Sequence, residues 1–179
     1  MLSRNYVVCL CLVLLAMISV ASEPPGVVVD VPFVAQEKNA CGAASVSMLM
    51  NYWARQQGKA QQADAAAIQL QLYSEKAKGI FASDLKRYLE AHGFRTFVFR
   101  GGWEDLKTHL AKGRPLIVAL GDSGTDSPLH YVVVTGLDWN QRLVFLNDPA
   151  DRKSRMADWR EFERGWAVTD HWTLLAVPN

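Results

Sequence analysis

The sequence predicts an α+β fold in a single domain, in which a helical first half packs on an antiparallel sheet formed by the second half. Before Gly93 the chain is dominated by segments with the composition and apolar spacing of helices. From Leu116 onward, short runs rich in Val, Ile and Phe are separated by clusters of Gly, Asp, Asn and Ser. Helices and strands that are segregated along a chain are typical of helices packed against an antiparallel sheet.

The length and the first residues predict the domain organisation. The chain has 179 residues, of which 50% are hydrophobic, and this is enough to bury one core. Residues 1–22 place Arg4 before an apolar run and end in small residues, which is the layout of a secretory signal peptide. We therefore expect residues 1–22 to be a signal peptide and residues 23–179 to be a single exported domain, periplasmic or secreted. An uncleaved N-terminal membrane anchor is the alternative, because the apolar run is near the shortest length that spans a membrane.

The charge balance limits the classes of binding partner to expect, and the cysteine content indicates the role of the one remaining thiol. The chain has 19 Lys and Arg against 18 Asp and Glu, and loss of the signal removes only Arg4, which leaves a balanced charge. A balanced charge does not favour nucleic acid or an anionic membrane surface, and we expect no integral membrane domain after signal cleavage. Cleavage also removes Cys9 and Cys11, so Cys41 has no intramolecular disulfide partner. A lone thiol in an exported protein is typical of a reactive or an intermolecularly paired cysteine.

The expected elements follow in order along the chain. The linker EPPG at residues 23–26 leads into an extended segment at residues 27–33. Helices are predicted at residues 41–53, 60–73, 80–92, 103–111 and 155–165. Ser83 is positioned to cap the third helix and Gly93 to end it. Strands are predicted at residues 94–99, 116–120, 130–137, 143–147 and 172–177, with the three central ones adjacent and antiparallel.

Cys41 is the first candidate for chemistry, because it stands at the predicted first turn of a helix in the stretch QEKNACGAASVSMLMNYW, residues 36–53. The positive end of a helix dipole favours a thiolate, and a neighbouring imidazolium favours it further. The alternative is an inert buried cysteine, since cysteine is among the most buried residue types. A nucleophile also needs a base, so the rest of the chain must supply one.

Four histidines are available as the base: His92, His109, His130 and His171. His92 ends a predicted helix, and His109 and His171 are expected to have surface or packing roles. His130 follows a polar loop and opens an apolar strand, so its ring should lie at the rim of the sheet. Asp148 ends the next strand in the sequence NDP and could orient that imidazole. A histidine that merely begins a strand, and an ordinary Asp-Pro turn, are the alternatives.

Gln36 is the candidate for stabilising an oxyanion. A side-chain amide just upstream of a nucleophile can act together with the backbone N–H of that nucleophile, and one such donor contributes ~2.7–4 kcal/mol in a transition state. The alternative role of Gln36 is to cap the turn that precedes the helix.

Three segments, QEKNACGAASVSMLMNYW, HYVVVTGLD and LNDPAD, occur in an order that resembles the papain-like cysteine peptidase family that removes double-glycine leaders from bacteriocins and also occurs as stand-alone exported proteins. The resemblance implies a papain-like fold and a peptide or protein substrate. It also implies that Cys41, His130 and Asp148 are catalytic and that Gln36 lines the oxyanion hole. Gln36 stands one place nearer to Cys41 than in the exporter-linked members.

The predicted function is that of a cysteine peptidase, which hydrolyses peptide bonds through a Cys-His-Asp triad and an acyl-enzyme. No organic cofactor is needed, and no metal is expected, because the chain has no CxxC or HxxxH spacing. Three alternatives remain. They are an acyl or peptidyl transferase that uses the same thiol, a non-catalytic peptide-binding module of the same fold, and an interaction protein that uses Cys41 for an intermolecular disulfide.

Overall fold

A computed structural model describes residues 25–122, 124 and 128–179. The predicted signal peptide, residues 1–22, lies outside the described residues. Within them the chain forms a mixed structure of helices and one antiparallel sheet, so the predicted α+β class is confirmed. None of the described helices is long and apolar enough to cross a membrane.

The sheet brings together strands from both ends of the described chain. The strands are β1 (Gly26–Val28), β2 (Phe94–Arg100), β3 (Leu116–Leu120), β4 (His130–Asp138), β5 (Leu143–Asn147), β6 (Arg155–Asp158) and β7 (Trp172–Pro178). Their order is β2-β7-β3-β4-β5-β6, and β1 pairs with the end of β4 that extends past β3. Strands β3, β4 and β5 are adjacent and antiparallel, as the sequence predicts.

Two features of the sheet differ from the prediction. Strand β1 joins the sheet, whereas the sequence predicts only an extended segment there, so helices and strands are only partly segregated along the chain. Residues Arg155–Asp158 form strand β6 instead of the first turn of a helix. A tertiary contact explains this difference. Residues Arg155–Asp158 pair with β5, whose backbone N–H and C=O groups on that side would otherwise have no strand partner.

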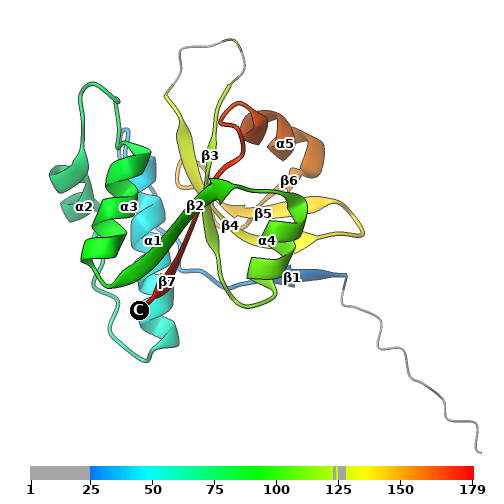
Figure 1. The fold of residues 1–179 in the computed structure, drawn as a ribbon, viewed down its shortest axis with the longest axis horizontal. Helices are drawn as coiled ribbons and strands as arrows, with labels where there is room; N and C mark the ends of the chain where they lie inside the picture. Colours follow the sequence, from blue (N-terminus) through cyan, green and yellow to red (C-terminus); the bar gives the residue numbers. More distant parts are fainter. Residues whose placement is uncertain (1–24, 123, 125–127) are drawn as a thin grey trace, which may run out of the picture.

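The helices are α1 (Cys41–Gln56), α2 (Ala65–Leu72), α3 (Ala82–Ala91), α4 (Trp103–Leu110) and α5 (Trp159–Ala167). In Figure 1, α1, α2 and α3 form a group on the left of the sheet, and α4 and α5 lie on the right. Helix α2 begins later than expected because Asp64 is its N-cap and accepts a hydrogen bond from Ala66 N. Ser83 is not a cap, because it lies within the first turn of α3. The N-cap position is Phe81, whose side chain provides no hydrogen bond.

Helix α1 is the central packing element and fixes the position of Cys41. Its side chains Val46, Met48 and Leu49 are fully buried. Three side chains of α1 donate hydrogen bonds to backbone carbonyls of or near the sheet: Ser45 Oγ to Tyr131 O at 3.2 Å, Tyr52 Oη to Gly113 O at 2.6 Å and Trp53 Nε1 to Ala176 O at 3.0 Å. The Ser45 bond holds the start of α1 beside the start of β4, and the other two fix the later turns of α1 near β3 and on β7.

Candidate active site

Cys41 is the first residue of α1 and is half-buried. Ala40, the N-cap, supplies no side-chain hydrogen bond to the first turn, so no capping side chain competes for the N–H groups at this helix start. The Sγ atom lies 3.9 Å from the carbonyl oxygen of Leu129, the residue before His130. The predicted nucleophile and the predicted base therefore lie across from each other.

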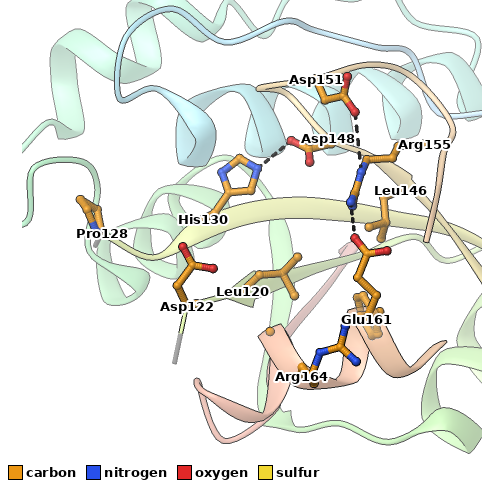
Figure 2. A pocket seen from close by; sticks show the side chains of 13 residues that line it. Leu120, Asp122, Pro128, His130, Leu146, Asp148, Asp151, Arg155, Glu161 and Arg164 are labelled. Atoms are coloured by element: carbon orange, nitrogen blue, oxygen red, sulfur yellow. Dashed lines mark hydrogen bonds and ion pairs between the residues drawn. The ribbon is translucent and has the colours of Figure 1, made fainter. Parts of the chain in front are cut away.

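His130 and Asp148 meet as the sequence suggests, from neighbouring strands. His130 is the first residue of β4, and Asp148 directly follows β5. The Nε2 atom of His130 lies 2.6 Å from Oδ1 of Asp148 (Figure 2). The His130 side chain is 31% exposed and the Asp148 side chain 11%, so the carboxylate is more deeply buried than the imidazole that it contacts.

The electrostatics of the pair favour an imidazolium and a carboxylate at neutral pH. Burial alone would lower the pKa of His130, but its interactions with Asp148 and Cys41 raise it to about 9. Burial would raise the pKa of Asp148, but the hydrogen bond and charge of His130, the Ala150 N–H and the nearby Arg155 keep that pKa below its usual value. A protonated His130 can both stabilise a thiolate at Cys41 and donate a proton to a leaving group.

Gln36 reaches the same site from the segment that precedes α1. Its backbone N–H donates to Pro149 O at 2.9 Å, which ties it to the turn that carries Asp148. Its side-chain Oε1 is buried and has no hydrogen-bond partner among the described residues. The side-chain amide is therefore not committed to a turn cap, and it lies in the pocket that also contains Cys41.

Two pockets flank His130. The pocket on the Cys41 side has a volume of about 570 Å³. It is lined by Gln36, Asn39, Cys41, Ala77, Lys78, Gly79, Ile80, Phe81, Ala82, Pro128, Leu129, His130 and Tyr131. The pocket on the Asp148 side, seen in Figure 2, has a volume of about 620 Å³. His130 and Pro128 line both pockets, so an extended chain that crosses the imidazole can occupy both.

The second pocket contains a residue that the sequence did not reveal. Arg155, expected on a helix, lies on β6 and pairs with Glu161 at 2.5 Å and with Asp151 at 3.6 Å (Figure 2). Arg155 also helps to lower the pKa of Asp148. No local signal in the sequence identifies it, because its place depends on the pairing of β6 with β5.

The other three histidines lie outside both pockets that His130 lines. His92 stacks on Tyr88 with ring centroids 4.0 Å apart. His109 is 6.0 Å from the ring of Phe99. His171 lies 2.7 Å from Glu163 Oε1 and packs edge-on against Trp166. The His171–Glu163 pair resembles the His130–Asp148 pair, but no described cysteine accompanies it, which fits the predicted packing role.

A metal site finds no support in the described part of the chain, where no group of three His, Cys, Asp or Glu side chains could hold an ion. The arrangement instead offers a thiol at a helix start, an imidazole held by a carboxylate and an uncommitted amide.

The fold is that of papain-like cysteine peptidases, and comparisons with known proteins show the family. The chain belongs to the Peptidase_C39-like family, whose sequence profile matches residues 28–173. No curated protein matches the chain. Solved structures share the fold. The chain is therefore a cysteine-type peptidase of that family.

Three solved structures illustrate the similarity in fold. A double-glycine-motif protease from an AMS/PCAT transporter, solved in complex with the leader peptide, is 21% identical, with 85% of this chain and 94% of that chain covered and a TM-score of 0.66. The peptidase domain of Streptococcus ComA is 19% identical, with 84% and 100% covered and a TM-score of 0.64. Xylellain, a cysteine protease from Xylella fastidiosa, is 12% identical, with 89% and 88% covered and a TM-score of 0.63.

Proposed function

We propose that this peptidase cleaves peptide bonds through a Cys41–His130–Asp148 triad and an acyl-enzyme, with Gln36 and the Cys41 backbone N–H as the oxyanion hole. The observation that carries the proposal is that His130, which contacts Asp148 at 2.6 Å, also lines the pocket in which Cys41 begins α1. Residues 1–22 have the pattern of a secretory signal, and we place the reaction in the periplasm or outside the cell.

The first half of the reaction transfers the acyl group to the thiol. The Cys41 thiolate attacks the carbonyl carbon, and the electron pair of the C=O bond moves to oxygen. Gln36 and the Cys41 N–H then donate hydrogen bonds to that oxyanion. As the tetrahedral intermediate collapses, the C–N bond breaks and the His130 imidazolium gives its proton to the leaving amine.

The second half releases the product. Neutral His130 takes a proton from water, which attacks the thioester carbon. Collapse of this second intermediate breaks the C–S bond and restores the thiolate beside the imidazolium. Asp148 keeps the imidazole oriented through both halves and stabilises its positive charge, without itself accepting a proton.

The two pockets suggest how a peptide lies in the site. The carbonyl to be attacked belongs beside Cys41 and Gln36, so the acyl part of the substrate occupies the pocket that they line. The leaving amine must reach His130, which also lines the other pocket. The residues after the cleaved bond therefore occupy the pocket shown in Figure 2.

The proposal is tested by comparing the peptides that residues 23–179 generate from a denatured protein mixture with those from Cys41→Ala and His130→Ala variants. We expect the new N-termini made by the wild type to disappear in both variants, because removing a triad member lowers kcat by about 10⁴–10⁶-fold. His92→Ala, which changes a histidine outside the site, should cleave like the wild type.

Two further measurements identify the acyl acceptor and test the role of His130. Cleavage in H₂¹⁸O should label the new C-termini if water is the acceptor, whereas transfer to an amine would give unlabelled conjugates. Alkylation of Cys41 by iodoacetamide near neutral pH should slow in His130→Ala, because the imidazolium that favours the thiolate is gone. Equal cleavage by wild type and Cys41→Ala would overturn the proposed mechanism.

A further inference from the structure

Asn147 has an environment that neither its strand nor the mechanism above explains. It is the last residue of β5, directly before Asp148, and it is only 1% exposed. Its side-chain Nδ2 donates to Val31 O at 3.1 Å, and its Oδ1 accepts from Ser154 N at 3.0 Å. One buried amide thus connects the segment that leads to the nucleophile, the end of β5 and the far side of the Asp148 turn.

A second contact joins the same two segments on the other side of Asp148. The Gln36 N–H donates to Pro149 O at 2.9 Å, and Pro149 is buried. The turn is closed within itself by Asp148 N to Arg152 O at 3.1 Å and by Asp151 N to Asp148 O at 3.0 Å. Asp148 is therefore flanked by two residues that bond to the segment carrying Gln36.

An exposed ion pair between the same two segments contributes less to fixing their geometry. Lys153 Nζ lies 2.7 Å from Asp30 Oδ1, but the two side chains are 48% and 68% exposed. Ion pairs in such positions contribute little to stability, since water and salt screen them. The buried Asn147 amide and the Gln36–Pro149 bond are the contacts that can fix the geometry.

We propose that Asn147 is a positioning residue for the peptidase reaction, which sets the Gln36 amide and the Asp148 carboxylate in register with each other by binding Val31 and Ser154. The inference rests on the proposed function, because it assigns Asn147 a part in the work of Gln36 and Asp148. Asn147 lines neither of the pockets beside His130, so it acts through these two residues and does not touch the substrate.

The chemistry of the site explains why asparagine is suited to it. The position needs one donor and one acceptor, held at a fixed distance by a planar group, and a side-chain amide supplies both. Aspartate would lack the donor to Val31 O, and leucine of similar size would lack both partners. A displacement of about 1 Å at a catalytic group can lower the rate about 10²-fold, so a small shift of this turn should appear in kcat.

The test compares steady-state kinetics of residues 23–179 carrying Asn147→Leu, Asn147→Asp or Asn147→Ser on a peptide that the wild type cleaves. We expect Asn147→Leu and Asn147→Asp to lower kcat by about 10- to 100-fold with a nearly unchanged KM, because the lost interaction acts in the transition state. Asn147→Ser should lie between, since a hydroxyl retains a donor and an acceptor. It also serves if the larger changes prevent folding.

Thr135→Val is the matched control for a purely structural effect. Thr135 is 2% exposed on β4, and its Oγ1 donates to Phe145 O at 3.2 Å, so its side chain bonds neither to the segment before α1 nor to the Asp148 turn. Its backbone carbonyl accepts from Val29 N at 2.7 Å, and that bond is kept in Thr135→Val. Its replacement should lower Tm as a lost buried hydrogen bond does, while kcat at a temperature where all variants are folded stays near the wild-type value. Equal kcat losses in Thr135→Val and Asn147→Leu would overturn the positioning role.

A double-mutant cycle with Gln36 measures a coupling in kcat that a change in stability alone would not produce. If Asn147 acts by placing Gln36, its replacement should lower kcat less in a Gln36→Ala background, where the positioned amide is already absent. Wild-type kcat in a folded Asn147→Leu protein would overturn the inference, provided that Cys41→Ala abolishes cleavage in the same assay. Cleavage that persists in Cys41→Ala would instead overturn the proposed function.

Discussion

In the proposed mechanism, His130 is the residue on which most of the site chemistry depends, because it interacts with Cys41 on one side and with the Asp148 carboxylate on the other. Its side chain is only partly exposed, and burial alone would favour the neutral ring. Asp148 reverses that preference at 2.6 Å. The form of His130 expected at neutral pH is therefore the imidazolium, which can stabilise a thiolate at Cys41 and give its proton to a leaving amine.

The raised pKa of His130 predicts the alkaline limit of activity. The imidazolium should persist up to about pH 9, so kcat/KM should stay high through neutral pH and fall above about pH 9, as the proton for the leaving amine is lost. In Asp148→Asn the limb should move down toward the ordinary histidine value of about 6.5. The measurement is kcat/KM between about pH 4 and pH 10.5 for both proteins.

Glu163→Gln is the control for that profile. Glu163 lies 2.7 Å from His171, so the change removes a carboxylate from a histidine outside the site, and the limb should not move. An alkaline limb unchanged in Asp148→Asn would contradict the role of Asp148.

The raised pKa of His130 also links the stability of the fold to pH. Since the folded-state pKa of His130 is raised, its stabilising contribution is fully present below about pH 6.5 and is lost as the pH rises through about 9.

Residues with local sequence signals could be found without a structure. Cys41 begins a helix, His130 begins a strand and Asp148 follows one, and the structure brings these residues and Gln36 to one place. Asn147 was visible only as the neighbour of Asp148. Its partner Val31 is 116 residues away, so nothing in the local sequence distinguishes it from an ordinary strand end.

Helix and strand ends were less predictable than the elements themselves, because competing contacts decide them. Asp64 and Asp158 cap α2 and α5, and both helices begin after them instead of before them. Strand β6 and the pairing of β2 with β7 depend on partners elsewhere in the chain. Periodicity within a segment carries no information about such partners, so strand β6 was missed, whereas β2 and β7 were predicted as strands without their pairing.

Helix α1 should be the element whose packing contributes most to stability. Leu49 is fully buried in α1, so Leu49→Ala should lower the free energy of unfolding by about 2–5 kcal/mol, through lost burial and a cavity. Leu70, on α2, is 89% exposed, and Leu70→Ala should change that free energy by about 0.5 kcal/mol or less. Urea denaturation of both variants in a Cys41→Ala background measures the difference without self-cleavage. Similar losses for the two leucines would contradict the predicted packing of α1.

At the scale of the whole molecule, the segment between β1 and α1 connects the sheet to the active site. Strand β1 pairs with Gly136–Asp138 of β4, and the approach is close, since a Cβ at Gly136 would lie 2.6 Å from Val27 O. The chain then buries Val31 and reaches Gln36. The two halves of the fold are therefore joined by strand pairing and by the contacts that hold Gln36, the residue proposed for the oxyanion hole.

This connection predicts different outcomes for two N-terminal truncations. Removal of residues 1–22, as by signal cleavage, leaves β1 intact, so residues 23–179 should fold, and the exported protein should have the corresponding mass.

Removal of residues 1–31 deletes β1, the buried Val29 and Val31 and the carbonyl that binds Asn147. Loss of each buried valine should cost about 1.5–3 kcal/mol, and kcat should fall as well, because the Gln36 segment keeps its bond to Pro149 but loses the contact between Val31 and Asn147. Thermal melting and peptide cleavage measure the two effects, with Val28→Ser, an exposed position in β1, as the control. Equal Tm and kcat for the two truncated proteins would show that the N-terminal segment does not anchor the site.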